Sequence, residues 1–402
     1  MTILHINKFY FLKGGAERHY FDLTTLLEAH GHTVIPFAMH HPDNVLTPWS
    51  KFFVSEKKYR SGTSVLERVR DTRDILWNFE AATKLEALIK EIKPDIAHLH
   101  NIAHQLSPSI IHTLHTYQIP IVQTLHDYKL ISADYLLWPR KQPWTERIVL
   151  RAERMLHQLL RSYHLVDHFI APSEYMKQVC VQAGIPTGKI TVIPYCLPHL
   201  TSPWKGEEPA SPLSLRRRGQ GEVIPYFLFV GRLSPEKGVS TLLDAMKLLP
   251  DIHLKIVGTG PEIINNKLPN VEFLGHQDQA AVQRLMQGAT ALVVPSVWPE
   301  NSPLVVYEAF TAGIPVLASR IGGIPELVQD MKNGLLFPLG NAVMLAATVK
   351  QFLALPYEHR HHMGEKGKLW MQGYADSEKI YPRLMKVYGT LNHGTISKIT
   401  TV

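Results

Sequence analysis

Short apolar segments and longer segments with helical periodicity alternate along almost the whole chain. Residues 3–7 form the first apolar segment, and a loop containing Gly14 and Gly15 then leads into a helix that ends near His30. Strands that are joined through helices run parallel, so this alternation predicts an α/β fold with helices on both faces of its sheets. The other strands expected in the first half are 33–39, 95–100, 119–125, 168–171 and 190–193.

One segment interrupts the alternation. Residues 201–222 are dominated by Pro, Ser, Gly and charged residues and show no apolar period, which is typical of a flexible insertion. The three arginines at 216–218 could bind an acidic partner, but a solvated charge run is the simpler interpretation. At 402 residues the chain is too long for one ordinary core. We therefore expect an N-terminal domain at 1–200 and a C-terminal domain at 223–375, each a doubly wound, Rossmann-like sheet.

The alternation resumes after the insertion. The strands expected there are 226–230, 252–257, 271–274, 291–294, 315–318 and 335–337. The helices expected between them are 239–249, 279–288 and 303–311. Helical patterns then run from about 342 to 388. By analogy with other two-domain folds, we expect the last helix, 376–392, to pack back on the N-terminal domain, and the tail at 393–402 to be frayed.

Composition is typical of a folded protein in a reducing compartment. Apolar residues make up 45% and charged residues 19%. No run of about eighteen apolar residues appears, so we expect no transmembrane segment. The N-terminus lacks the basic start and long apolar stretch of a secretion signal. The two cysteines, Cys180 and Cys196, provide neither a disulfide framework nor a zinc-binding spacing, and we expect a cytoplasmic protein.

The chain is basic, with a formal net charge of +7 and a pI of about 9.1. Such a charge suits a nucleic acid, an anionic membrane surface or a phosphate-bearing substrate. No known nucleic-acid-binding module accompanies it, so we expect no nucleic-acid partner and favour the other two. A mildly basic pI is equally compatible with no functional meaning at all.

Open parallel sheets bind ligands beyond the carboxyl ends of their strands, so residues that directly follow strands are the most informative. With two such domains, the natural site is the cleft between them. The segment 295–328 follows an expected strand and contains Glu300 and Glu308, which are separated by seven residues. A carboxylate accepts two hydroxyl hydrogen bonds, as a ribose diol requires, although both acids could also be ordinary residues of a helix surface.

The same segment predicts the start of a helix. Ser302 is a good N-cap, and Pro303 suits the first helical position. The backbone N–H groups of Leu304 and Val305 would then face a ligand at the end of the preceding strand. A helix N-terminus favours an anion there by roughly 0.3–1 kcal/mol, in addition to the hydrogen bonds.

A second informative segment, 231–238, also follows an expected strand. Arg232 can bind a phosphate through two N–H groups at once, and Lys237 adds a point charge. Gly231 and Gly238 permit tight turns and a close approach of backbone to ligand. Together with the helix start, these residues predict a pocket for a diphosphate, whose departure as a leaving group needs fixed positive charge.

With these motifs in their order, the chain resembles the retaining nucleotide-sugar glycosyltransferases of the GT-B fold, the large group usually called family 4. The C-terminal resemblance covers about 226–340 and rests on the two acids, the 231–238 turn, Ile-Val-Gly-Thr-Gly-Pro at 256–261 and Phe-Leu-Gly-His at 273–276. The N-terminal resemblance is weaker and rests on Gly14-Gly15, His126-Asp127 and Ala-Pro-Ser-Glu at 171–174. Many members have a glycine and an aromatic residue after the first Glu, where this chain has Asn301-Ser302-Pro303.

The resemblance implies a role for each matching residue. Arg232 and Lys237 would hold the pyrophosphate, assisted by the backbone N–H groups of Leu304 and Val305, at the helix start that Pro303 begins. Glu308 would hold the ribose hydroxyls, and Glu300 would contact hydroxyls of the transferred sugar. Gly15 would let the first loop lie against the donor phosphates. His126 would meet the donor sugar near the reacting carbon, so the residues expected to act in catalysis are His126, Arg232, Lys237 and Glu300.

The implied reaction keeps the anomeric configuration of the sugar. The leaving phosphate oxygen takes the proton of the acceptor on the same face, so no protein nucleophile is needed, and none stands out in the sequence. The acceptor would be a glycan or a lipid-linked glycan, and the N-terminal domain would bind it. No cofactor beyond the nucleotide-sugar is implied.

Histidines offer alternative interpretations. A lone histidine such as His126 is often a core residue at a strand end, although the neighbouring Asp127 could orient it for function. His98 and His100 would share one face of a strand, but no Cys or carboxylate set nearby completes a metal site. The chain also contains no Asp-x-Asp pair, the usual divalent-metal motif of the other large glycosyltransferase fold. We therefore expect no metal.

The segment 144–163 predicts a helix with arginines at 147, 151, 154 and 161 and apolar residues between them. Such a helix could lie on an anionic membrane, where a lipid-linked acceptor would be found. Packing of the helix on its own domain is the more common outcome.

Two competing functions remain in view. A nicotinamide-dependent dehydrogenase would need a G-x-G-x-x-G fingerprint, which Gly258-Thr259-Gly260 does not complete because Ile263 occupies the sixth position. A sugar- or nucleotide-binding protein that has lost catalysis is the alternative from a different class. The complete set of two acids and two basic residues favours the active transferase.

Overall fold

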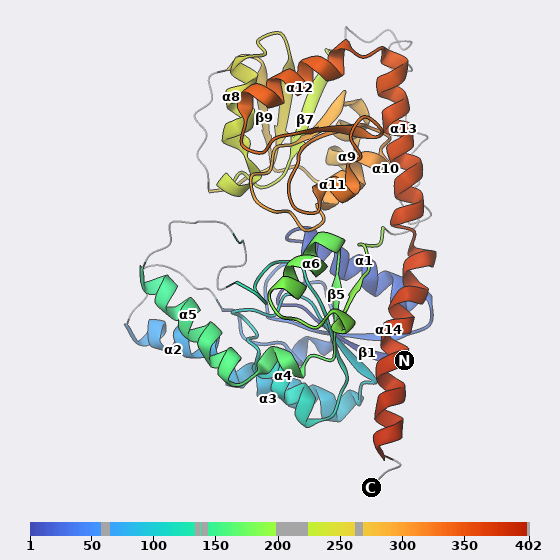
Figure 1. Ribbon diagram of the computed structural model, residues 1–402. Coiled ribbons are helices and arrows are strands. Elements are labelled where there is room, and N and C mark those ends of the chain that lie inside the picture. Colours follow the sequence, from blue (N-terminus) through green and yellow to red (C-terminus); the bar gives the residue numbers. More distant parts are fainter. Residues whose placement is uncertain (58–64, 133–136, 138–143, 198–223, 262–267, 400–402) are drawn as a thin grey trace. The chain divides into compact units, whose positions relative to one another are not determined.

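The computed structural model describes residues 1–57, 65–132, 137, 144–197, 224–261 and 268–399 (Figure 1). The chain divides into two compact units, Met1–Pro198 together with Ser377–Val402, and His199–Asp376. The insertion expected at 201–222, with its three arginines, lies outside the described residues.

Six strands form the sheet of the first unit, in the order β2-β1-β3-β4-β5-β6. All neighbouring strands are parallel. The strands are β1 (Thr2–Ile6), β2 (Thr33–Phe37), β3 (Ile96–Leu99), β4 (Ile121–Thr124), β5 (His168–Ala171) and β6 (Ile190–Val192). The described helices that connect them are α1 (Gly15–Ala29), α2 (Val65–Leu76), α3 (Phe79–Ile92), α4 (Ser109–Thr116), α5 (Trp144–Leu159) and α6 (Glu174–Gln182). Short 3-10 helices lie at η1 (Pro48–Phe52), η2 (Ser162–Leu165) and η3 (Thr187–Lys189).

The side-chain pattern explains these elements. Strands β3 and β4 are buried at every position, as expected for strands covered on both faces. Helix α1 buries Tyr20, Leu23 and Leu27 against the sheet. It ends just before Gly31, whose φ of 78° lies in the left-handed region that glycine tolerates.

The last helix, α14 (Ser377–Ile399), belongs to the first unit, although it follows the second unit in sequence (Figure 1). Ile380, Leu384 and Tyr388 are buried in the core that also contains Ile3 of β1. The Tyr388 hydroxyl lies 2.6 Å from Nδ1 of His98. An apolar stripe and several polar contacts, among them those of Tyr381 with His32 and of Tyr388 with His98, therefore fix this helix to the first unit.

Helix α14 continues to Ile399, so its last turns fall in the segment that the sequence predicts to be frayed. The glycine in that stretch, Gly394, costs a helix only about 1 kcal/mol, and it does not end the helix. Residues 400–402 lie outside the described part of the chain.

The second unit contains another sheet of six parallel strands, in the order β12-β11-β10-β7-β8-β9. The strands are β7 (Tyr226–Val230), β8 (His253–Val257), β9 (Val271–Gly275), β10 (Ala291–Val294), β11 (Val316–Ser319) and β12 (Gly334–Phe337). The described helices are η4 (Pro235–Lys237), α8 (Val239–Lys247), α9 (Gln279–Gly288), α10 (Leu304–Thr311), α11 (Ile324–Leu327), α12 (Ala342–Ala354) and α13 (Tyr357–Tyr374). Phe227, Phe229, Leu242, Phe337 and Phe352 are buried in its core.

Both sheets confirm the predicted fold class of two doubly wound parallel sheets with flanking helices. Among the residues that the structure describes, no helix combines the length and the apolar character that crossing a bilayer requires.

Candidate functional site

The order of the second sheet indicates where a ligand binds. Along this unit the strand order changes direction between β7 and β10, because β8 and β9 lie on one side and β11 and β12 on the other. In such sheets the loops that follow the two strands at this point leave a crevice for a ligand. Arg232 and Lys237 follow β7, and Glu300 follows β10, so both predicted motifs lie at the switch point.

Gly238 allows the two loops to lie against each other. Its φ is 71°, and a Cβ at this position would lie 1.9 Å from the carbonyl oxygen of Pro295. The N–H of Val297 also donates to the carbonyl of Glu236 at 3.0 Å. Only glycine can supply both the left-handed backbone and the close approach.

A partly buried ion pair joins the two loops. Nζ of Lys237 donates to Oε1 of Glu300 at 2.6 Å, and the hydroxyl of Ser296 donates to the same oxygen at 2.8 Å. The Glu300 side chain is 7% exposed and that of Lys237 is 26% exposed. Nζ of Lys237 also lies 5.6 Å from the centre of the Trp298 ring. Two residues that are 63 positions apart in sequence therefore share one hydrogen bond in the predicted pocket.

Arg232 is held by a neighbouring acid that we did not predict. Its Nη2 donates to Glu236, and its Nε donates to the hydroxyl of Ser234 at 3.1 Å. The Ser234 hydroxyl donates in turn to Glu236 at 2.7 Å. These bonds occupy Nε and one hydrogen of Nη2. The side chain is 54% exposed, so its remaining N–H groups can reach a ligand.

The environment of Glu236 keeps this acid charged. Burial by itself raises the pKa of Glu236, but the hydrogen bond from Ser234 and the nearby Arg232 guanidinium together hold it below its usual value. A charged Glu236 fixes the guanidinium before any ligand arrives. The spacing of Arg232 and Glu236, four residues apart, is the sequence signal that could have identified this pair.

The start of helix α10 differs from the prediction by one residue. Pro303 is the N-cap, and the helix begins at Leu304. Ser302 does not cap the helix, because its hydroxyl bonds the Tyr307 hydroxyl at 2.7 Å in the interior. The cap prediction for Ser302 and the assignment of Pro303 to the first helical position are therefore wrong.

The prediction that Leu304 and Val305 present the first N–H groups of the helix is compatible with this start. Both residues are half-buried, and N–H groups in the first turn have no partner within the helix. Glu308 lies one turn further along α10 and is also half-buried.

The backbone of Glu300 is held from a third loop. Gly322 has a φ of 60°, and a Cβ there would lie 2.4 Å from the carbonyl oxygen of Glu300. That oxygen accepts the N–H of Gly323 at 2.7 Å. The glycine pair after β11 therefore positions the first acid of the motif, a function that the sequence analysis did not assign to it.

The remaining predicted residues lie in the first unit. Gly15 is exposed and is the first residue of α1. His126 follows β4 and is half-buried, beside a hollow of about 20 Å³ that Lys8 and Asn101 also line. These positions correspond to the carboxyl ends of the strands, where a doubly wound sheet binds ligands.

The sequence suggested that Asp127 orients His126, but His100 and Tyr195 are the hydrogen-bonding partners found at its ring nitrogens. Its Nε2 lies 2.8 Å from Nδ1 of His100, and its Nδ1 lies 3.0 Å from the Tyr195 hydroxyl. The carboxylate of Asp127 instead accepts the backbone N–H of Lys129 at 2.9 Å. Burial and the charge of Lys8 lower the pKa of His126 to about 3, so the ring is neutral.

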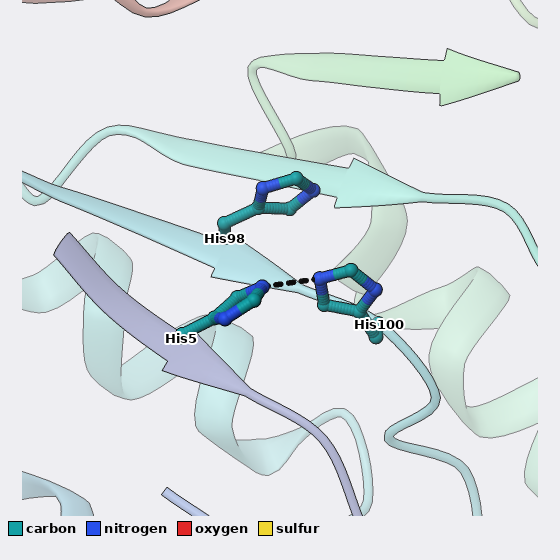
Figure 2. A group of neighbouring side chains, drawn as sticks. All are labelled: His5, His98 and His100. Carbon is teal, nitrogen blue, oxygen red and sulfur yellow. Dashed lines mark hydrogen bonds between the residues drawn. The ribbon is translucent and has the colours of Figure 1, made fainter. Parts of the chain in front are cut away.

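Three buried histidines, His5, His98 and His100, come together on β1 and at the end of β3 (Figure 2). Their nitrogens lie within 4.8 Å of one another, a spacing that raises the question of a metal. Nε2 of His5 and Nε2 of His100 are 2.6 Å apart, however. Ligands of a tetrahedral zinc ion, with bonds of about 2.0–2.1 Å, lie roughly 3.3 Å apart. The spacing is that of a hydrogen bond.

His98 is likewise engaged in hydrogen bonds. Its Nδ1 lies 2.6 Å from the Tyr388 hydroxyl, and its Nε2 lies 2.7 Å from the Thr124 hydroxyl. The trio therefore fits a hydrogen-bonded network better than a coordination sphere. The sequence revealed that His98 and His100 share a face, but it gave no sign that His5 joins them.

Known families and proteins match the chain over both units. The model of the family described as "Glycosyl transferases group 1" matches residues 217–370, and that of "Glycosyltransferase Family 4" matches residues 13–197. An uncharacterized glycosyltransferase of Methanocaldococcus jannaschii, MJ1178, is 34% identical over 174 residues, which cover 42% of this chain and about half (48%) of the relative. An uncharacterized 42.6 kDa protein from the cps region of Klebsiella pneumoniae is 26% identical over 83% of this chain and 89% of its own length.

Among solved structures, Anabaena HepE in complex with UDP has a TM-score of 0.64 at 20% identity, covering 97% of this chain and 100% of HepE. This likeness extends over both units and concerns the fold. The two family models together span the motifs of the switch point and the first unit. The chain therefore belongs to the group 1 glycosyltransferases and has the GT-B fold.

Proposed function

We propose that this protein transfers a sugar from a nucleoside diphosphate-sugar to a glycan acceptor, with retention of the anomeric configuration. The observation that carries the proposal is the bond between Lys237 and Glu300, which joins the basic loop after β7 to the acidic loop after β10. A phosphate-binding cation and a hydroxyl-binding acid are thus held together at the switch point of the sheet. A nucleotide-sugar offers the matching pair of groups.

Each residue of the pocket has a chemical task in this proposal. Arg232 and Lys237 bind the pyrophosphate, and the N–H groups of Leu304 and Val305 add the positive end of α10. Glu308 binds the ribose hydroxyls, and Glu300 binds hydroxyls of the transferred sugar. The proposal also assigns Gly15 to the donor phosphates and His126 to the transferred sugar.

The bond that breaks joins the anomeric carbon to the phosphate oxygen, and the bond that forms joins the same carbon to the acceptor oxygen. The acceptor proton passes to the departing phosphate oxygen on the same face of the sugar. The leaving nucleoside diphosphate gains negative charge as the bond breaks. Arg232 and Lys237 stabilise that charge, which is a role that a divalent metal has in other enzymes. The proposal therefore includes neither metal nor cofactor.

The acceptor side of the proposal rests on the first unit. In this proposal the acceptor is a glycan of the cell envelope. On α5, the side chains of Ile148, Met155 and Leu159 are 55%, 69% and 81% exposed and lie on one face of the helix. Exposed arginines at 147, 151 and 154 flank this face. An exposed apolar face beside a row of arginines suits the surface of an anionic membrane, on the cytoplasmic side.

The test is to incubate the full chain with UDP-, GDP- and ADP-sugars and candidate glycan acceptors. Release of one nucleoside diphosphate together with a new glycoside of unchanged anomeric configuration, read by NMR, is the expected result. An inverted product would refute the retaining chemistry. Binding of a nucleotide-sugar without any turnover across the panel would favour the alternative of an inactive binding protein.

A further inference from the structure

A chain of hydrogen bonds runs through the buried histidines to His126. Nδ1 of His5 lies 2.9 Å from the Thr24 hydroxyl, and Nε2 of His5 lies 2.6 Å from Nε2 of His100 (Figure 2). Nδ1 of His100 lies 2.8 Å from Nε2 of His126, and Nδ1 of His126 lies 3.0 Å from the Tyr195 hydroxyl. The chain thus joins helix α1, strand β1, the end of β3 and the residue that follows β4.

The three imidazoles of this chain are uncharged. Burial lowers the pKa of His5 and of His100 well below the usual value, and the neighbouring histidines lower it further. Burial and Lys8 do the same for His126. A neutral imidazole has one nitrogen that donates and one that accepts. Each ring in the chain must therefore donate in one direction and accept from the other.

Thr24 fixes the direction of the chain. Its hydroxyl has one hydrogen, which it donates to the carbonyl oxygen of Tyr20 at 2.9 Å. The Thr24 oxygen must then accept from His5, so His5 carries its hydrogen on Nδ1 and accepts at Nε2.

The same reasoning assigns the donor and acceptor nitrogens of His100 and His126. His100 donates from Nε2 to His5 and accepts at Nδ1, and His126 donates from Nε2 to His100. Nδ1 of His126 is left as the acceptor, and the Tyr195 hydroxyl donates to it. One backbone carbonyl on α1 thereby determines which nitrogen of His126 carries the hydrogen.

We propose that Thr24, His5 and His100 are positioning residues that hold His126 as the Nε2–H tautomer, with Nδ1 as a hydrogen-bond acceptor. This inference rests on the proposed function, in which His126 meets the donor sugar. The fixed tautomer means that His126 accepts a hydrogen from a sugar hydroxyl, which replaces the Tyr195 hydroxyl at Nδ1. The other tautomer would present an N–H at this position.

The α1 helix provides a matched pair of variants. Thr24→Val removes the hydroxyl that starts the chain, whereas Thr24→Ser keeps it. Thr25 makes the same type of bond to the backbone, from its hydroxyl to the carbonyl of Phe21 at 3.0 Å, but its side chain is exposed. Thr25→Val therefore controls for loss of a helix hydroxyl without loss of the histidine contact.

The tautomer is measured by long-range ¹H–¹⁵N NMR on the full chain labelled at histidine, with His126 assigned from the His126→Gln spectrum. We expect Nε2 of His126 to be protonated in the wild type, Thr24→Ser and Thr25→Val, and a mixture of tautomers in Thr24→Val. An Nδ1–H tautomer in the wild type, or an unchanged spectrum in Thr24→Val, would overturn the inference. His100→Gln, which interrupts the chain beside His126, replaces Thr24→Val if that variant does not fold.

Turnover separates this inference from the proposed function. Thr24→Val should lower kcat by about tenfold to a hundredfold, as a misplaced contact does, while Thr24→Ser and Thr25→Val keep it. If His126→Gln retains full turnover while the NMR result holds, the sugar contact of His126 is wrong, and the tautomer assignment stands. If His126→Gln loses turnover but the tautomer is unchanged in Thr24→Val, the positioning inference fails and the proposed function remains.

Discussion

At the scale of single residues, the proposed donor site pairs each of its two cations with an acid. Lys237 is paired with Glu300, and Arg232 with Glu236. The pairing reduces the electrostatic cost of placing Arg232 and Lys237 close together. It also holds both of these side chains in place. In the proposed function, a nucleotide-sugar then binds without the entropy cost of ordering these side chains. The two acids are thus part of the preorganised site.

Replacing either cation by alanine tests this site. We expect Arg232→Ala and Lys237→Ala each to lower kcat/KM by roughly a hundredfold or more, because each removes a contact to the charge that develops on the leaving group. The measurement is the initial rate of nucleoside diphosphate release. Lys247→Ala is the matched control, since that lysine is exposed and pairs with Asp244 on α8. Near-normal rates in both site variants would contradict the assignment.

At the scale of elements, the site depends on how closely the turn between η4 and α8 approaches the loop after β10. Gly238→Ala would place a Cβ 1.9 Å from the carbonyl of Pro295 at a φ of 71°. We expect a loss of at least about 1–2 kcal/mol in the free energy of unfolding, from the left-handed backbone alone. Urea denaturation measures this loss. Gly389→Ala on α14, where a Cβ meets nothing within 4 Å, should cause no loss and should stabilise the helix by up to about 1 kcal/mol. Equal stability of the two variants would contradict the close approach.

The next prediction is that helix α5 binds an anionic membrane surface. Each basic residue near an anionic surface contributes about 1 kcal/mol, so replacing the arginines at 147, 151 and 154 by Glu should weaken vesicle binding by about a hundredfold or more. Cosedimentation with vesicles of phosphatidylglycerol and of phosphatidylcholine measures this effect. Lys90→Glu on α3, another exposed cation of the same unit, is the control. Equal binding of the wild type to neutral and anionic vesicles, or to neither, would refute the membrane proposal.

At the scale of the whole molecule, the reaction is proposed to use fixed protein charge in place of a metal. We expect full transferase activity after dialysis against EDTA, because Arg232, Lys237 and the start of α10 already supply positive charge to the leaving group. The measurement is turnover before and after chelation, with added Mg²⁺ as the second arm. Complete loss of activity that Mg²⁺ restores would refute metal independence.

Local pattern determined much of this protein. The apolar segments predicted the strands of both sheets to within about two residues, because a strand covered on both faces must be apolar along its length. The motifs at 231–238 and 295–328 were expected to follow strands directly, and they follow β7 and β10. The start of α10 was misjudged at Ser302, because its hydroxyl bonds Tyr307 in the interior rather than the helix end. The preference of serine for helix N-caps does not reveal a competing hydrogen bond to a buried residue such as Tyr307.

What the sequence by itself determined is therefore the strands, the helices and the residue types that follow them. Only the tertiary structure decided which of those residues meet. His5 lies beside His98 because β1 pairs with β3 in that register, although the strands are far apart in the chain. The pairing of Lys237 with Glu300 similarly depends on β7 and β10 being neighbours. Strand order is set by the packing of the whole sheet, which leaves no local periodicity to read.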